Sequence, residues 1–304
     1  MQFVVFSIAY PLLWLVSKLP FKLLYVLSNG VFFLLYYLIG YRKKVVRGNL
    51  ELVFPQKTDN ERLIIEKNFY RHMCDMFLEM IKTMTISKEQ LQKRFVFSNL
   101  EVLHQLENQN QSVMLMFPHY ASWEWVIALD AHIASKGYAI YQKIGNVHFD
   151  RMVRAIRQKF GTTLITTVDT REIVMSNKKN GILSMYGILS DQSPMPKKAQ
   201  LWTPFMGITV PVHTGAEVLC QKLDLPAVYL KVSKRARGYY QGSFELLSER
   251  PKELPPFELT KRFLQKVEAS INEEPAYYFW THKRWKHKDK VPKAVMNDSE
   301  TQRR

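Results

Sequence analysis

Short apolar runs alternate with longer amphipathic stretches from Leu100 onward, and this alternation narrows the possible folds more than any other feature. The pattern predicts an α/β fold: a mixed sheet covered by helices. Upstream, Thr58 and Glu61 have the spacing of a capping box, which predicts a helix from there to about Thr83. The strands are expected near residues 113–117, 138–144, 162–168, 183–190, 226–233 and 239–247, and the helices near 122–135, 148–160, 169–179, 213–223 and 258–273.

The N-terminal region is almost wholly apolar in two runs, residues 1–16 and 23–41. The second run approaches the length that spans a bilayer, and Arg42, Lys43, Lys44 and Arg47 follow it at once. Basic residues at that place predict that the downstream chain is cytoplasmic. We interpret residues 1–45 as a membrane anchor, which either spans the bilayer or forms a helical hairpin in one leaflet. A buried pair of core helices is the alternative.

The chain is strongly basic, with 43 Lys and Arg against 27 Asp and Glu in 304 residues. Its partners are therefore expected to be anionic: membrane phospholipid, a phosphorylated substrate, an acidic protein or nucleic acid. The two cysteines, Cys74 and Cys220, lack metal or redox spacing, and packing is their expected role. Residues 46–286 would form the main domain, and residues 287–304 a basic, polar, disordered tail.

His119 falls where the strand 113–117 gives way, after Pro118, to a helix-like pattern that begins near Ser122. In open α/β sheets, ligands bind beyond the carboxyl ends of strands, so this histidine is well placed for chemistry. Glu124 lies in the first turn of the following helix. We expect its carboxylate to hold one imidazole nitrogen while the other nitrogen accepts a proton. The alternative is a helix-start acid beside a capping histidine.

Two further clusters fall at predicted element edges. Asn146 precedes a helix on which Asp150, Arg154 and Arg157 share one face, where an arginine is suited to hold a phosphate. A solvated charged face is the alternative there.

The second cluster, Asp191 and Gln192, follows the strand 183–190 directly, which puts both side chains on the same rim as His119. Turn chemistry is the alternative for these two residues.

Near the end of the chain, residues 280–286 interleave aromatic and basic side chains, including Trp280, His282 and Arg284. This pattern suits nucleic acid or a membrane interface, and the apolar N-terminal region favours the membrane. The sequence contains no Gly-rich phosphate loop, no metal-binding His or Cys pair and no Gly-x-Ser-x-Gly elbow. Hydride transfer, zinc hydrolysis and serine esterase chemistry are therefore not expected.

Taken in order, these motifs resemble the bacterial late acyltransferases of lipid A biosynthesis, the lauroyl and myristoyl transferases. That family belongs to the wider glycerolipid acyltransferase group with a His-x4-Asp/Glu signature. The resemblance runs from the apolar N-terminal region to about Lys286. Relatives often carry Gly before the histidine and Gly-Asn before Trp-Glu, where this chain has Pro118 and Ala121-Ser122. The resemblance rests on four sets of residues in this order: His119 with Glu124; Asn146 through Asp150, Arg157 and Gly161; Asp191-Gln192 followed by Pro204-Phe205-Met206-Gly207; and Trp280, His282 and Arg284.

The resemblance implies a glycerolipid-acyltransferase-like fold at the inner membrane, with the catalytic domain on the cytoplasmic side and no metal or cofactor. His119 would act as general base on an acceptor hydroxyl of a lipid A precursor, which attacks a long-chain acyl thioester of acyl carrier protein or coenzyme A. Glu124 would fix the histidine tautomer, and Arg157 would bind an acceptor phosphate or stabilise developing negative charge. Arg154, Asn146, Asp191 and Gln192 are the further substrate-binding candidates, the last two expected to be structural or acceptor-orienting.

Other functions remain open at this stage. The same catalytic group acts on other lipids, such as a lysophospholipid or an amino-acid lipid. A basic peripheral membrane protein or nucleic-acid binding protein is the non-enzymatic alternative, although the resemblance implies no nucleic-acid partner.

Overall fold

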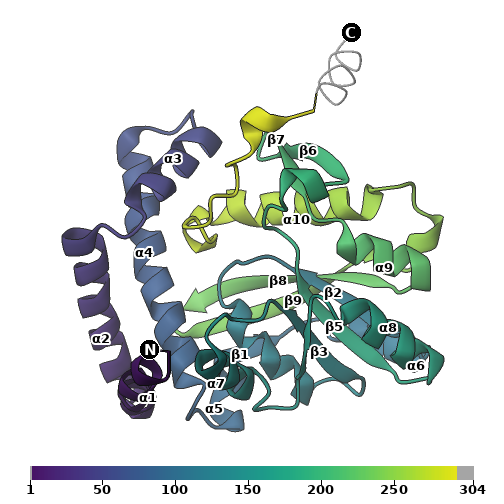
Figure 1. Ribbon diagram of the computed structural model, residues 1–304, viewed down its shortest axis with the longest axis horizontal. Helices are drawn as coiled ribbons and strands as arrows, with labels where there is room; N and C mark the ends of the chain where they lie inside the picture. The colour runs from purple at the N-terminus through teal and green to yellow at the C-terminus, as the bar shows by residue number, and fades with distance from the viewer. Residues whose placement is uncertain (1, 293–304) are drawn as a thin grey trace.

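The computed structural model describes residues 2–292, and it is a mixed α/β structure with a largely parallel sheet covered by helices (Figure 1). The seven-stranded sheet has the order β1-β9-β8-β2-β5-β3-β4, and a separate hairpin is formed by β6 and β7. Strands β8, β2, β5, β3 and β4 run parallel, whereas β9 is antiparallel to β8 and parallel to β1. The strands are β1 (Phe95–Phe97), β2 (Val113–Phe117), β3 (Lys136–Tyr141), β4 (Thr163–Thr166), β5 (Ser184–Leu189), β6 (Leu201–Phe205), β7 (Ile208–Val212), β8 (Ala227–Ala236) and β9 (Tyr239–Ser248).

Helices α9 and α10 lie on one side of the sheet, and α5 and α7 lie on the other (Figure 1). The α-helices are α1 (Gln2–Lys18), α2 (Phe21–Phe33), α3 (Lys43–Val53), α4 (Asp59–Lys82), α5 (Lys88–Arg94), α6 (Glu101–Asn108), α7 (Val147–Arg157), α8 (Thr170–Lys179), α9 (Gly215–Leu223) and α10 (Glu258–Glu273). Helix α2 continues as a π-helical segment, η1 (Leu34–Ile39). The 3-10 segments are η2 (Trp123–Ala131), η3 (Pro196–Lys198), η4 (Pro251–Glu253), η5 (Pro275–Tyr277) and η6 (Lys288–Lys290).

The order of the central strands creates the crevice in which a site can form. The chain leaves β2 towards β3 on one side, and it leaves β5 towards β8 on the other side of β2. Because β2 and β5 are parallel neighbours with Phe117 opposite Leu189, their carboxyl ends lie side by side. In open α/β sheets, such a switch point is where ligands bind.

Most predicted elements are confirmed. The capping box at Thr58 and Glu61 begins α4, and the six predicted strands all occur, with shifted ends. Both cysteines are free and buried, as packing residues would be. Residues 21–39 form one continuous 19-residue helix, long and apolar enough to cross a membrane.

Several elements differ from the predictions. Segment 122–135 is not an α-helix: residues 123–131 form the 3-10 segment η2, in which residues 125–129 are buried in succession, so the segment has no solvent-facing side for an amphipathic pattern to mark. Strands β6 and β7 were missed because Pro204 and Pro211 interrupt them; proline is tolerated in such edge strands. The three-residue β1 was missed as well.

Residues 280–286 do not form a membrane-interface surface, since Trp280 and Arg284 are fully buried. The Arg284 guanidinium donates to the Ser193 hydroxyl at 2.7 Å and to the Pro211 carbonyl at 3.1 Å. The predicted tail begins with the short η6 turn, and from residue 293 on it lies outside the described residues.

Candidate active site

His119 and Asp191 meet at the shared carboxyl edge of β2 and β5. Each lies two residues beyond its strand, after Phe117 and Leu189, and these two end residues are opposite one another in the sheet. Parallel pairing therefore brings together two side chains that are 72 residues apart in the chain. Nδ1 of His119 is 2.7 Å from Oδ1 of Asp191.

The partners of this pair favour one tautomer of the imidazole. Asp191 is buried, which by itself raises the pKa of its carboxyl, but the His119 charge and hydrogen bonds outweigh burial and hold that pKa below its usual value. The carboxylate is thus ionised and accepts the Nδ1 hydrogen, and in the neutral imidazole this leaves the Nε2 lone pair free to accept. The Gln192 side-chain amide lies 3.2 Å from Nε2 and is placed to donate to it.

The predicted contact between His119 and Glu124 was wrong. Glu124 pairs with Arg157 instead, through two hydrogen bonds to the guanidinium, at 2.9 Å to Nε and 2.5 Å to Nη2. Ala121, with a φ of 50°, turns the chain just before η2, so that Glu124 faces α7 rather than the imidazole. Burial lowers the pKa of Arg157, but the Glu124 charge more than reverses this and leaves the pKa above its ordinary value.

The turn that carries His119 is held by residues that the sequence did not indicate. Backbone hydrogen bonds join His119 to Phe279 at 3.2 Å and Ala121 to Tyr277 at 3.0 Å. The Ala121 carbonyl also accepts from Nε2 of His72 at 3.3 Å, while Nδ1 of His72 faces the Lys234 ammonium at 3.3 Å. Burial, reinforced by Lys234, lowers the pKa of His72 to about 3, so this histidine is neutral.

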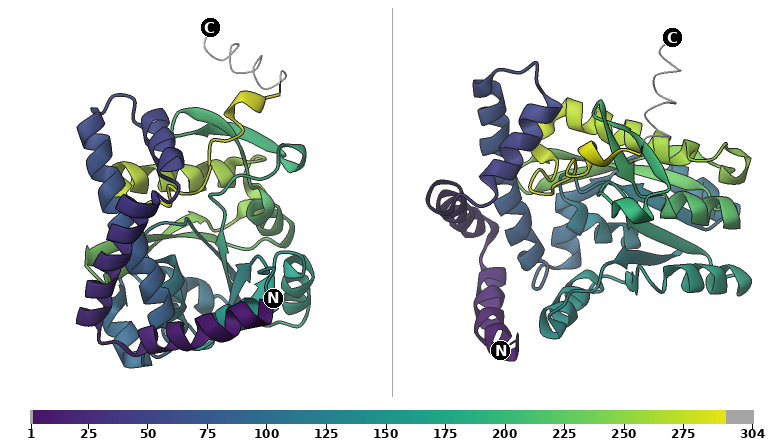
Figure 2. Two further views of the ribbon diagram at one scale, coloured as in Figure 1. Left: turned by 60° about the vertical axis from the view of Figure 1, so that its left-hand side comes forward. Right: turned by 45° about the horizontal axis from the view of Figure 1, so that its top comes forward.

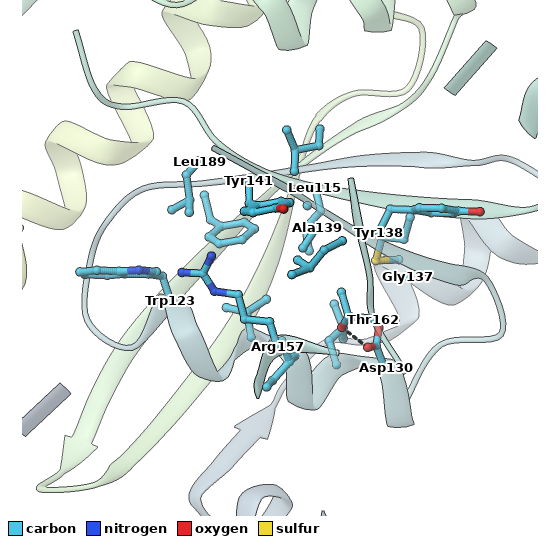
Figure 3. Close-up of a pocket in the computed structure, with 18 of the residues that line it drawn as sticks. Leu115, Trp123, Asp130, Gly137, Tyr138, Ala139, Tyr141, Arg157, Thr162 and Leu189 are labelled. Atoms are coloured by element: carbon cyan, nitrogen blue, oxygen red, sulfur yellow. Dashed lines mark hydrogen bonds between the residues drawn. The ribbon is translucent and has the colours of Figure 1, made fainter. Parts of the chain in front are cut away.

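An apolar pocket of about 670 Å³, counted with its open mouth, lies beneath the edge of the sheet that bears His119. Its walls come from β2, β3, β5 and η2, among them Leu115, Ala139 and Leu189 (Figure 3). Arg157 and Trp123 line one region of the pocket, and Asp130 with its hydrogen-bonded partner Thr162 lines another (Figure 3). Its lining is mostly apolar, as the binding of part of an alkyl chain requires.

The structure gives the other α7 candidates local partners. The Asn146 side chain caps α7 by accepting from the amides of His148 and Phe149, at 3.0 and 3.3 Å. Asp150 is buried and accepts from the Ile144 amide at 2.9 Å. Arg154 donates to the Tyr141 hydroxyl at 2.9 Å. Arg157 is the α7 candidate whose side chain pairs with Glu124 of η2.

The Asp191 carboxylate also interacts electrostatically with a buried, positively charged group, Arg284. Burial lowers the pKa of the Arg284 guanidinium, and Tyr278 and Asp191 oppose that change. The neighbouring His282 is kept neutral, because burial lowers its pKa to about 4. Of these two groups, Arg284 is therefore the one that carries a positive charge.

Comparison with known proteins identifies the family. Residues 1–287 match the family of bacterial lipid A biosynthesis acyltransferases. The chain belongs to this family.

Individual relatives of this acyltransferase family member are distant. A lipid A biosynthesis lauroyltransferase of Escherichia coli K12 is 23% identical over 282 residues, covering 90% of this chain and 89% of the relative. A palmitoleoyltransferase from the same organism is 24% identical over 277 residues, covering 90% and 88%. A lipid A biosynthesis acyltransferase of Shigella flexneri is 28% identical over 152 residues, a match that spans only about half of each chain.

Proposed function

We propose that this protein transfers a long-chain fatty acyl group from an acyl thioester to a hydroxyl of a lipid A precursor, as a secondary acylation. The observation that carries the proposal is the histidine dyad: Nδ1 of His119 is 2.7 Å from a buried, ionised Asp191, and the Gln192 amide lies 3.2 Å from Nε2. Membership of the lipid A acyltransferase family supports the substrate class.

In this mechanism the acceptor hydroxyl takes the place of the Gln192 amide and donates its hydrogen to Nε2. The oxygen attacks the thioester carbonyl as the proton moves to the imidazole, and Asp191 stabilises the imidazolium that forms. The tetrahedral intermediate collapses, the carbon–sulfur bond breaks, and the imidazolium returns the proton to the leaving thiolate. The products are an ester and a free thiol, and no covalent enzyme intermediate forms.

We assign the acyl chain of the donor to the apolar pocket beside His119. Burial of each methylene there would contribute about 0.8 kcal/mol. The Glu124–Arg157 pair lines the same pocket, where the guanidinium is suited to stabilise the developing oxyanion or to hold a phosphate of the acceptor. In this role Glu124 positions Arg157 instead of fixing the tautomer of His119.

The basic charge of the chain suits both an acidic carrier protein and an anionic lipid. We place the protein at the inner membrane with the catalytic domain on the cytoplasmic side, where acyl thioesters are made. Asn146 caps α7 and Arg154 donates to Tyr141, which lines the pocket, and their proposed contribution is to shape the acceptor side.

The test is a reconstituted assay. Purified full-length protein would receive acyl carrier protein or coenzyme A thioesters together with either tetra-acylated lipid A precursor or lysophospholipids. We expect acylation of the lipid A precursor, and a loss of about 100-fold or more in the His119→Ala variant. Acylation of lysophospholipids alone would overturn the proposed acceptor, and an undiminished His119→Ala variant would overturn the proposed base.

A further inference from the structure

Helices α1 and α2–η1 expose an unusual amount of apolar side chain. Ile8, Leu12 and Leu15 on α1 are 64%, 59% and 58% exposed, and Val26 and Leu38 on α2–η1 are 66% and 68% exposed. The exposed apolar side chains of these two helices are called the apolar N-terminal surface below. With the relevant side of the molecule turned forward, α1 runs across the bottom and α2 runs along α4 (Figure 2, left). Because the two helices run in different directions on one side of the molecule, their exposed apolar side chains form a broad surface.

The opposite side of α2–η1 is bound to charged residues of α4 along its length. Tyr25 donates to Glu79 at 2.8 Å, Ser28 to Asp75 at 2.6 Å and Tyr36 to Glu66 at 2.8 Å. All three carboxylates are buried. The contacts span about 16 Å of helix at 1.5 Å per residue, more than half of the α2–η1 segment.

These contacts extend to the main body of the protein. Arg237, next to the β8–β9 turn, pairs with Asp75 through two hydrogen bonds of 2.9 and 2.6 Å, and it donates to Asn29 at 2.8 Å. Lys82 donates to the carbonyls of Ser17 and Leu19, at 2.8 and 2.9 Å, which holds the junction of α1 and α2. Helix α2–η1 is therefore part of the folded body and not a separate rod.

This packing is incompatible with a helix that crosses a bilayer. If α2–η1 spanned the membrane as packed here, it would carry α4, with Glu66, Asp75 and Glu79, to the depth of the hydrocarbon, where charged groups are costly. If it left α4 in order to span, the same carboxylates would lose the hydroxyl donors of Tyr25, Ser28 and Tyr36. Only a helix that lies along the membrane plane keeps its apolar side chains in the lipid and its hydroxyls bonded to the carboxylates of α4.

The charge of the region identifies the partner. Residues 1–50 contain six Lys and Arg and no Asp or Glu. Lys18 and Lys22 lie near the α1–α2 junction and Arg42 and Lys44 follow η1, all of them exposed, so both ends of the α2–η1 stripe carry positive charge. An apolar face bordered by basic residues is complementary to an anionic phospholipid leaflet.

We propose that α1 and α2–η1 lie flat in one leaflet of an anionic phospholipid bilayer, with their apolar N-terminal surface in the lipid, and that neither helix crosses it. The N-terminus and the catalytic domain are then on the same side of the membrane. The α1 helix also packs against α7, which carries Arg157: Phe6 of α1 contacts the rings of His148 and Phe149. The lipid contact and the edge of the pocket thus belong to one rigid unit. The proposal does not depend on which lipid is acylated.

A first experiment determines the side on which the N-terminus lies. Single cysteines are introduced by Gln2→Cys in α1 and, as a matched control on the body, by Lys252→Cys; the native Cys74 and Cys220 are buried and give the background. A membrane-impermeant maleimide is applied to inverted and to right-side-out inner-membrane vesicles. We expect both sites to react from the same side. Reaction of Gln2→Cys from the side opposite to Lys252→Cys would overturn the proposal.

A second experiment measures depth, using a fluorophore on Leu23→Cys, Gly30→Cys or Leu38→Cys and lipids brominated at known carbons. A flat helix places all three at one shallow depth, whereas a spanning helix places position 30 far deeper than the other two. Apart from its chain neighbours and the backbone of its own helix, no heavy atom of the described residues lies within 4 Å of where a side chain would begin at Gly30, so this variant is expected to fold.

Charge is tested with phosphatidylglycerol and phosphatidylcholine vesicles. We expect binding at least 10-fold tighter to the anionic vesicles, and a loss of most of that difference in the Lys22→Glu/Lys44→Glu variant. Equal binding to both lipids would contradict the assigned partner.

Discussion

Replacing Asp191 with asparagine tests which carboxylate serves His119. The Oδ1 atom of Asp191 accepts the Nδ1 hydrogen at 2.7 Å in a buried position, so no water takes over its role. In Asp191→Asn, a side-chain amide facing Nδ1 would donate to it, and the imidazole hydrogen would move to Nε2, where a hydroxyl proton must be accepted. By analogy with the Asp-to-Asn change in serine proteases, we expect kcat to fall by about 10,000-fold with little change in KM.

Glu124→Gln is the matched control. This substitution also removes one carboxylate from the same edge, but the Glu124 carboxylate contacts Arg157 and not the imidazole. Its loss should be smaller than that of Asp191→Asn and should appear partly in KM. The assay is the initial rate of radiolabelled acyl transfer from the thioester to the lipid acceptor, with thermal unfolding as the check on folding. A near-inactive Glu124→Gln beside a largely active Asp191→Asn would refute the assignment.

Three further predictions concern the pocket, the arginine and stability. Ala139→Leu adds three carbons inside the pocket, where each buried methylene of the acyl chain contributes about 0.8 kcal/mol. In a competition between donors, the preferred acyl chain should therefore shorten by two or three carbons. An unchanged preference would place the acyl chain elsewhere. Arg157→Lys loses the two-point contact with Glu124, and kcat/KM should fall about 100-fold, a cost of roughly 3 kcal/mol; full activity in steady-state kinetics would contradict the role of the guanidinium. Folding lowers the pKa of His72 to about 3, so below about pH 6.5 the unfolded chain binds a proton at this residue that the folded chain does not. The free energy of unfolding should therefore fall by about 1.4 kcal/mol per pH unit as the pH is lowered. Thermal melts between pH 7 and 5 should show a flatter pH profile for His72→Gln than for the wild type.

The alternating pattern was sufficient to predict the class of fold and the location of His119, because burial of strands and amphipathic helices is a local property of the sequence. It also put Asp191 and Gln192 on the same rim. The identity of the pair did not follow, because it depends on β5 lying next to β2, although β3 and β4 come between them in the chain. Sequence spacing favoured the near acid, Glu124, whereas strand pairing supplied the distant one.

Other features depended on contacts that no local pattern records. The His72 side chain and the Tyr277 carbonyl hold the His119 turn through hydrogen bonds to the backbone of Ala121, and the identity of Ala121 in the sequence does not reveal such bonds. Arg284 was expected at a membrane surface because exposed and buried arginines look alike in a sequence. Its burial requires acceptors from Ser193 and from the proline-containing β7, which the sequence did not reveal as a strand.

The central claim, that the His119 site acylates a lipid A precursor, is tested most directly by mass spectrometry of lipid A. Lipid A would be compared between cells that lack the gene and the same cells that carry either the wild-type gene or the His119→Ala form. We predict that deletion lowers the lipid A mass by one acyl chain, that wild type restores it, and that His119→Ala does not. Identical lipid A in all three strains would contradict the proposed function.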